Sequence, residues 1–159
     1  MSSYNRRAFC LTALAALTGC GFQPVYGPGG DANGLRGRIN FADPADEEGF
    51  ELVARLEDRL GQPANADLDL YAELFVTEEA VGFLSDGTIS RYNVLGRVNW
   101  TLTGNAGQAL AGDGRLFTSY SATSTTVATI VAQRDARRRL AVILADGIVA
   151  DILTAADTL

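Results

Sequence analysis

Three segments in the middle of the chain alternate apolar and polar residues with a period of two. They are residues 67–77, 89–103 and 108–121. Such alternation is typical of antiparallel strands that pack one face against a core and leave the other face in water. Asp86-Gly87 and residues 104–107 predict tight hairpin turns between the three strands. The alternation slips at residues 78–81, where we expect a β-bulge.

Apolar residues at three- and four-residue steps predict a helix before these strands. Asp43 can cap such a helix and Pro44 suits its first turn, and the acidic residues that follow favour the positive end of the helix dipole. Gly61 is suited to end it. The side chains expected to form its buried stripe are Phe50, Val53, Leu56 and Leu60.

A second helix is predicted at the end of the chain, again from apolar residues at helical spacing. Its expected buried stripe comprises Ala136, Leu140, Ile143, Leu144, Ile148 and Ile152. Residues 127–131 are also apolar but lie out of phase with that stripe. The pattern leaves open whether they end a strand or form the first turn of the helix.

A short apolar segment, residues 35–41, precedes the first helix and is expected to be a fourth strand. The resulting order β-α-β-β-β-α predicts an α+β fold, in which an antiparallel four-stranded sheet carries two helices on one face. Tyr92, Trp100 and Tyr120 are expected to pack in its core rather than to form a sugar-stacking platform. The chain of 159 residues is long enough for one such domain, which we expect over residues 35–159.

The N-terminus has the features of an export signal. Arg6 and Arg7 precede an apolar run, residues 8–17, which is about half the length of ~20 residues needed to span a bilayer. We therefore expect residues 1–19 to be a signal peptide that is removed. The arginine pair leaves twin-arginine export open beside the general secretory route.

The end of this signal, Leu17-Thr18-Gly19-Cys20, resembles the lipobox of bacterial lipoproteins. The resemblance implies that Cys20 becomes the first residue of the mature chain and carries acyl chains that hold the protein on a membrane. Residues 20–34 are rich in glycine and proline and are expected to be a tether between the lipid and the domain.

The composition excludes several kinds of chemistry. All 13 basic residues are arginine, and the chain contains no histidine, which excludes histidine-based acid–base catalysis and lysine Schiff bases. The formal net charge of −6 argues against a nucleic-acid partner, which usually meets a basic surface. No nucleotide-binding, metal-binding or nucleophile motif is present. We therefore expect a protein that is not an enzyme and uses no cofactor or metal.

Two clusters of charged residues are candidate binding sites, and for each of them a solvated surface is the stronger interpretation. Asp67 and Asp69 share a strand face, but nothing nearby completes a metal-ligand set, which favours a solvated face. Arg137, Arg138 and Arg139 could bind an anion, although a solvated helix face is the stronger interpretation.

Four short motifs follow one another along the chain, beginning at the lipobox cysteine. They are Cys20-Gly21-Phe22-Gln23-Pro24-Val25-Tyr26-Gly27, Asp86-Gly87-Thr88-Ile89-Ser90-Arg91-Tyr92, Asn99-Trp100-Thr101-Leu102 and Ala132-Gln133-Arg134-Asp135-Ala136. Their order and spacing resemble the lipopolysaccharide-assembly lipoprotein family LptE over nearly the whole mature chain. The likeness is greatest to the shorter, arginine-rich members of alphaproteobacteria.

This resemblance implies an α+β lipoprotein on the periplasmic side of the outer membrane. Such a protein plugs the lumen of the LptD β-barrel, helps that barrel assemble, and takes part in inserting lipopolysaccharide into the outer leaflet. Its expected partners are LptD, lipopolysaccharide and, through the lipid anchor, the outer membrane. Arg91 and Arg97, on the solvated face of one predicted strand, are candidates for contact with lipopolysaccharide phosphates. Ordinary surface arginines are the alternative.

Two other functions stay open at this point. One is that of a different outer-membrane lipoprotein adaptor, for example in the assembly of barrel proteins. The other is a lipid-anchored periplasmic enzyme that works with carboxylates alone, which requires a deep cleft with two facing acids.

Overall fold

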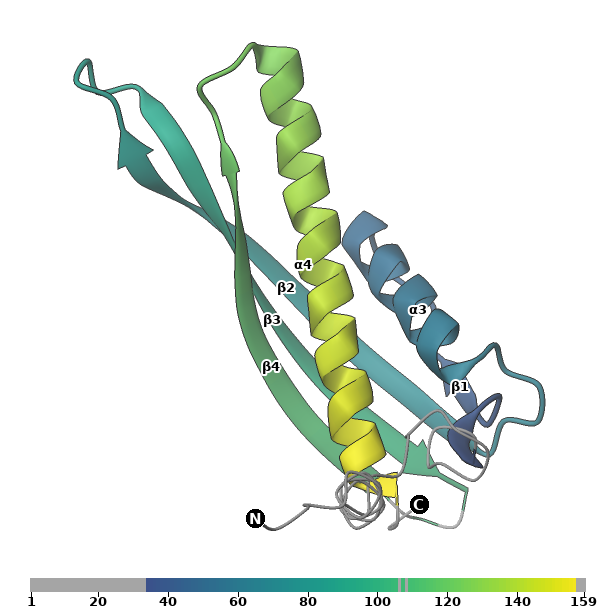
Figure 1. The fold of residues 1–159 in the computed structure, drawn as a ribbon. Helices are drawn as coiled ribbons and strands as arrows, with labels where there is room; N and C mark the ends of the chain where they lie inside the picture. Colours follow the sequence, from purple (N-terminus) through teal and green to yellow (C-terminus); the bar gives the residue numbers. More distant parts are fainter. Residues whose placement is uncertain (1–33, 106, 108, 157–159) are drawn as a thin grey trace, which may run out of the picture.

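In the computed structural model, two helices cover one face of a curved four-stranded sheet (Figure 1). The structure describes residues 34–105, 107 and 109–156. The elements are β1 (Ile39–Phe41), α3 (Glu47–Leu60), β2 (Leu68–Phe83), β3 (Ile89–Gly104), β4 (Ala109–Ser121) and α4 (Thr126–Thr154). The predicted signal peptide, Cys20 and nearly all of the predicted tether lie outside the described residues. The α+β class and the element order of the sequence analysis are confirmed.

The sheet has the order β1-β2-β3-β4. Strands β2, β3 and β4 pair antiparallel, as expected for hairpins. Strand β1 pairs parallel to β2, with Ile39 beside Leu68 and Phe41 beside Leu70. The sheet is therefore mixed, and the expectation of a purely antiparallel sheet was wrong for β1. The reason is that α3 lies between the two strands in sequence and returns the chain to the end of the sheet where β1 began.

The first strand is also shorter than expected. Leu35 is buried within a helical turn, and Gly37 turns the chain with a φ of 75°. The Gly37 amide donates to the carbonyl of Leu60 at 3.0 Å. Since this contact fixes residues 35–38 against the end of α3, only Ile39–Phe41 remain for pairing with β2.

The turns and the irregularity of the long hairpin agree with the sequence pattern. Gly87 has a φ of 82°, and the Asp86 carboxylate accepts a hydrogen bond from the Thr88 amide at 2.9 Å. The β2–β3 register shifts between Ala80 and Gly82, which places the bulge where the alternation slipped. Strand β2 therefore continues beyond the predicted end at residue 77.

Helix α3 begins one turn later than expected. Its N-cap is Asp46, whose carboxylate accepts from the Gly49 amide at 2.7 Å, whereas Asp43 and Pro44 precede the helix. Gly61 ends it with a φ of 86°, as predicted. The buried stripe is Leu52, Leu56 and Leu60, and Phe50 is 62% exposed. The predicted stripe was thus correct only in its C-terminal half, because the side of α3 that is buried against its neighbours carries Leu52 rather than Phe50.

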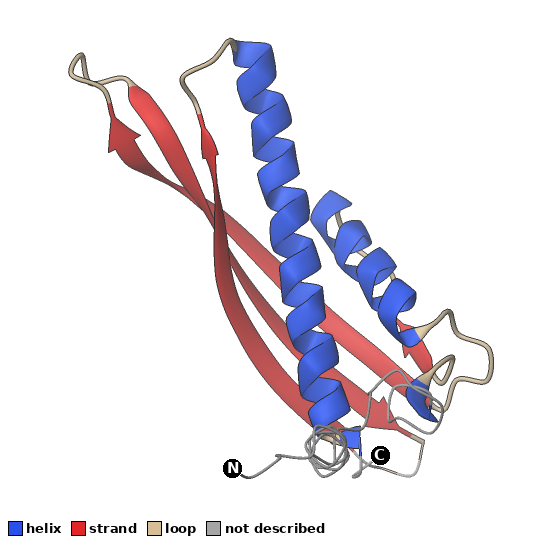
Figure 2. Cartoon of the chain, in the orientation of Figure 1, coloured by secondary structure: helices blue, strands red, loops and turns tan. Residues whose placement is uncertain are grey.

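Helix α4 lies along most of the length of the sheet (Figure 2). Residues 127–131 form its first turns, which resolves the alternative left open above, and Val127 is 73% exposed. The buried side chains are Ala136, Leu140, Ala141, Leu144, Ala145, Ile148, Val149 and Ile152. Ile143 lies outside this band, at 38% exposed. The band is wider than the predicted stripe because α4 packs on the sheet and on α3 at the same time.

The core contains the three aromatic residues as predicted. Trp100 and Tyr120 are buried, and Tyr92 is partly buried with its ring stacked on that of Tyr120 at a centroid distance of 5.3 Å. Aromatic rings at this separation attract one another beyond their burial alone. These rings fill the space between the sheet and α4 and have no exposed platform to offer a sugar.

Candidate functional site

The helices leave one face of the sheet open. Because side chains alternate along a strand, the odd-numbered residues in the middle of β2, β3 and β4 project from the face opposite α3 and α4. The register places Thr77, Leu95 and Phe117 in one row across the three strands. Phe75 lies beside this row, and Phe75 and Phe117 are 47% and 64% exposed. Together these side chains line a shallow hollow, which we call the open-face hollow.

Two arginines border the open-face hollow. Arg97 on β3 lies directly opposite Arg115 on β4, and both side chains line the hollow. Arg115 has one long ion pair, to Asp113 at 3.8 Å, and no ion pair joins Arg97 to any described residue. Like charges directly opposite each other on a sheet are destabilising. The geometry thus supplies two guanidinium groups suited to an anionic oxygen ligand.

The structure separates the two arginines that the sequence proposed together. Arg91 and Arg97 are both exposed on β3, but they lie six residues apart, which is ~20 Å along a strand. A single phosphate therefore cannot contact both. The residue that lies opposite Arg97 is Arg115, which sequence reasoning missed. Counting residues outward from the predicted turn at 104–107 pairs Arg97 with Gly114, one position away, because the observed register joins Thr103 to Ala109. The tertiary structure was therefore needed to identify the Arg97–Arg115 pair.

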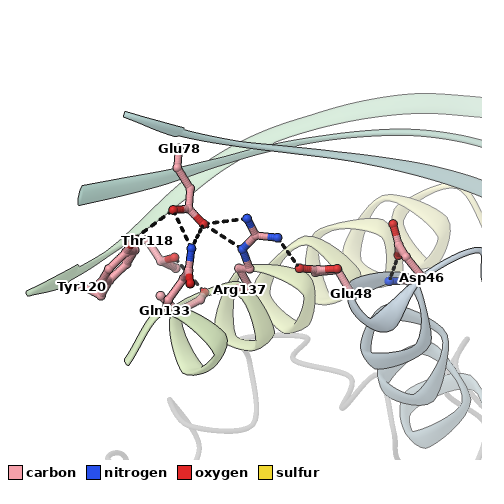
Figure 3. Close-up of polar contacts among 9 residues, drawn as sticks. Asp46, Glu48, Glu78, Thr118, Tyr120, Gln133 and Arg137 are labelled. Atoms are coloured by element: carbon pink, nitrogen blue, oxygen red, sulfur yellow. Dashed lines mark hydrogen bonds and ion pairs between the residues drawn. The ribbon is translucent and has the colours of Figure 1, made fainter. Parts of the chain in front are cut away.

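A second polar site lies on the helix-covered side, centred on Glu78 of β2 (Figure 3). Its carboxylate accepts hydrogen bonds from Tyr120 Oη at 2.9 Å, Gln133 Nε2 at 2.9 Å and Arg137 Nε at 2.8 Å. Arg137 also donates to Glu48 on α3 at 2.8 Å. These contacts join β2, β4, α3 and α4 through one group of side chains, which we call the Glu78 cluster.

The Glu78 cluster changes the acidity of its members. Burial raises the pKa of Glu78, but the hydrogen bonds from Gln133, Arg137 and Tyr120 outweigh burial, and the pKa lies below its ordinary value. Burial, followed by the hydrogen bond to Glu78, raises the pKa of Tyr120 to about 12. Glu78 is therefore ionised and Tyr120 neutral near neutral pH. Every side chain in the cluster has a partner within it, so the cluster holds the fold together.

The other sequence candidates make structural contacts as well. Arg137 belongs to the Glu78 cluster, and Arg138 and Arg139 pair with Asp135 one turn earlier in α4. Among these three arginines, none is thus left free for an anion.

The two aspartates proposed as a pair also bind neighbouring side chains. Asp67 binds Arg38 at 2.7 Å and Asp69 accepts from Asn40 Nδ2 at 2.9 Å. Within the described part of the chain, no group of three potential metal ligands is found. None of the described helices has both the length and the apolar character needed to cross a membrane.

These features define a class of protein: an α+β domain in which a long and a short helix pack on one face of a four-stranded sheet and the other face stays open. The family described as "LptE: Lipopolysaccharide-assembly" matches residues 38–152. The chain therefore belongs to the LptE family, a family of non-catalytic lipoproteins, and has a role in lipopolysaccharide assembly. This membership confirms the resemblance to the family, and the last three of the four motifs lie within the matched residues.

Solved structures share the fold at low sequence identity. A protein from Caulobacter crescentus has a TM-score of 0.65 at 23% identity, covering 80% of this chain and 96% of that chain. Rare lipoprotein B from Shewanella oneidensis has a TM-score of 0.58 at 14% identity, covering 74% and 92%. A minor lipoprotein from Acinetobacter baumannii has a TM-score of 0.52 at 17% identity, covering 73% and 88%. No curated protein matches the chain.

Proposed function

We propose that this protein is an outer-membrane lipoprotein that plugs the LptD β-barrel, helps it assemble and contacts lipopolysaccharide during its insertion into the outer leaflet. The observation that carries the proposal is the Arg97–Arg115 pair beside the apolar open-face hollow. Membership of a lipopolysaccharide-assembly family supports the same function.

The chemistry of the open face suits an amphiphilic ligand. Lipopolysaccharide carries phosphates next to acyl chains, and guanidinium groups bind phosphate oxygens with two parallel hydrogen bonds. Phe75, Leu95 and Phe117 offer an apolar surface within one or two strand positions of both arginines. Arg91 lies farther along β3 and would contact a second anionic group on the same molecule. The open-face hollow is thus the part of the described surface best suited to lipopolysaccharide.

The distribution of charged groups among the described residues also suits a plug. The lumen of a large membrane barrel is polar, so a protein that fills it needs a polar exterior and a core that is packed internally. The core of this chain contains no buried charged side chain among the described residues, and its ion pairs lie at the surface or partly buried. A lipid on Cys20 would hold such a plug at the periplasmic side of the membrane.

The function is tested by depleting the protein from the cell and measuring surface lipopolysaccharide and folded LptD. Both should fall; unchanged levels of both would contradict the proposal. The anchor is tested separately with Cys20→Ala, which should release the chain from the membrane fraction or leave its signal uncleaved. Acylated, membrane-bound protein in that variant would exclude Cys20 as the lipid site.

The open-face hollow is tested by lipopolysaccharide binding to the full-length acylated protein. The double change Arg97→Gln and Arg115→Gln should lower the affinity about tenfold or more, because two charge-assisted hydrogen-bond donors are lost. Arg138→Gln, an exposed arginine on α4, is the matched control and should bind normally. Equal binding by all three proteins would show that lipopolysaccharide contacts another surface.

A further inference from the structure

Strand β2 has a long free edge. Strand β1 covers only Leu68–Leu70 of it, and no described strand pairs with β2 on that side from residue 71 onward. The chain has neither proline nor lysine in residues 71–83. These are two of the residue types with which proteins usually protect an edge from added strands. The bulge near Gly82 bends the far end, so the regular part of the free edge is residues 72–78.

The hydrogen bonds of β1 show which backbone groups face this edge. The Leu68 amide donates to the carbonyl of Arg38, and the Leu70 carbonyl accepts from the Ala42 amide. Because these groups alternate in direction along a strand, the N–H and C=O groups of Ala72, Leu74 and Val76 also face the free edge. An added strand would find three alternate residues, each with both of its backbone groups available.

A hollow lies at the start of the free edge, between α3 and β2, with a volume of about 240 Å³. Its apolar wall includes Leu52, Leu56 and Leu74. The acidic residues Asp43 and Asp46 also line it, and Glu73 lies beside it on the edge strand, with its side chain on the opposite face of the sheet. None of the described residues around it is basic. The hollow therefore offers an apolar site for side chains and an acidic border beside an unpaired strand.

We propose that this edge binds an extended segment of a partner protein, which adds as a strand beside β2 in continuation of β1. Apolar side chains at alternate positions of the segment would enter the hollow, and a basic residue would meet the acidic border. Main-chain hydrogen bonds supply affinity in this mode of recognition, and the pockets for alternate side chains supply specificity. The inference does not depend on which partner the Proposed function names.

Strand β1 shows that this edge of β2 accepts a parallel strand. Strand β1 already pairs parallel to β2 on the same edge and ends at Phe41, and Pro44 follows three residues later. Proline cannot donate to a strand ladder, and the chain turns there into α3. The edge beyond Leu70 is thus compatible with pairing but cannot be reached by β1.

The decisive variant is Ala72→Pro, with Ala111→Pro as its matched control. The Ala72 amide faces the free edge of β2, and the same alternation places the Ala111 amide on the free edge of β4. Neither change removes a hydrogen bond between the described strands, and both place a proline ring where an added strand would lie. Circular dichroism and thermal unfolding would check that both variants fold.

The probe is a capped octapeptide in which valine alternates with threonine and arginine, added to the full-length acylated protein. Amide exchange should slow roughly tenfold or more at Ala72, Leu74 and Val76 and stay unchanged at Ala111 and Asp113. Ala72→Pro should weaken binding roughly tenfold or more, while Ala111→Pro should not. Equal protection of both edges, or unchanged binding by Ala72→Pro, would overturn the proposal.

A second pair of variants tests the acidic border without altering the backbone, in case Ala72→Pro fails to fold. The double change Asp43→Asn and Glu73→Gln should weaken binding of the peptide. The double change Glu51→Gln and Glu57→Gln, on α3 outside the hollow, should leave binding unchanged. A peptide with glutamate in place of arginine should bind more weakly. Equal binding of the two peptides would overturn the proposal, as would dimerisation of the protein through this edge in the absence of peptide.

Discussion

Arg97 and Arg115 lie directly opposite each other on β3 and β4, on the face of the sheet that the helices leave open. Cross-strand neighbours of like charge repel each other. Within the described part of the chain, the only ion pair of either arginine is the long one from Arg115 to Asp113, at 3.8 Å. We therefore expect Arg115→Gln to raise the midpoint of thermal unfolding by about 1–3 °C at low salt. The gain should shrink in high salt, because ions screen exposed charges.

If Arg115→Gln is more stable and also binds lipopolysaccharide more weakly, Arg115 contributes to ligand binding at the expense of stability. Arg138→Gln is the control here also, since Arg138 pairs with Asp135 and its loss should not stabilise the fold. A decrease in stability in Arg115→Gln would contradict the repulsion argument.

The absence of a side chain at Gly96 of β3 leaves room for two leucines of α4. A Cβ atom at this position would lie 2.8 Å from Leu140 Cδ2 and 2.8 Å from Leu144 Cδ1. Since both leucines are buried in the core, Gly96→Ala should lower the free energy of unfolding by about 1–3 kcal/mol. Chemical denaturation measures this directly.

The control for that prediction is Gly147→Ala, in the interior of α4, where an added Cβ would meet no atom within 4 Å. Alanine is the better helix former, so this change should stabilise the protein by about 0.5–1 kcal/mol. The two substitutions should therefore change the free energy of unfolding in opposite directions. This difference separates the effect of close packing at Gly96 from the effect of backbone freedom at Gly147.

The Glu78 cluster should contribute measurably to stability. Glu78→Ala leaves Tyr120, Gln133 and Arg137 without their shared acceptor in a partly buried site. A buried polar group that loses its hydrogen-bond partner lowers the free energy of unfolding by about 1–3 kcal/mol. Because this site is only partly buried, water can replace part of the lost hydrogen bonding. We expect a loss at the lower end of that range for the whole variant. Arg59→Gln, a surface arginine near Asp146, should cost less.

Stability should fall at both ends of the pH scale through two members of this cluster. The pKa of Glu78 is lower in the folded protein than its ordinary value of 4.5, so its contribution is present above that value and is lost as the pH falls below it. The pKa of Tyr120 is raised from 10.0 to about 12, so its contribution is present below pH 10.0 and is lost as the pH rises toward 12. Thermal unfolding across the pH range measures both effects.

Two variants assign these effects to their residues. Glu78→Gln should flatten the acid side of the stability curve, because an amide does not titrate there. Tyr120→Phe should flatten the alkaline side for the same reason. An unchanged acid or alkaline limb in the corresponding variant would show that other groups cause the loss.

The position of the helix cap is testable with two neighbouring aspartates. Asp46 accepts from the Gly49 amide at 2.7 Å, whereas Asp43 precedes the helix. Asp46→Ala should therefore destabilise the fold by about 1 kcal/mol, and Asp43→Ala should change it much less. Comparable losses of stability in both variants would show that Asp46 is not the specific N-cap of α3.

The amino-acid sequence by itself determined the elements whose signals lie close together in the chain. A period of two identified three strands, and turns such as Asp86-Gly87 set the antiparallel hairpins. The same local pattern located the bulge near residue 81 and the end of α3 at Gly61. Each of these features depends on residues a few positions apart, because backbone geometry and hairpin closure act over that distance.

Only the tertiary structure decided how distant segments meet. The parallel pairing of β1, the burial of Leu52 and the exposure of Phe50 all depend on how α3 lies against the rest of the fold. The same holds for Glu78, which has three partners that lie 42 to 59 residues away along the chain. A helix that carries apolar residues in two rows can bury either row. The neighbouring helix and sheet determine which of the two rows is buried.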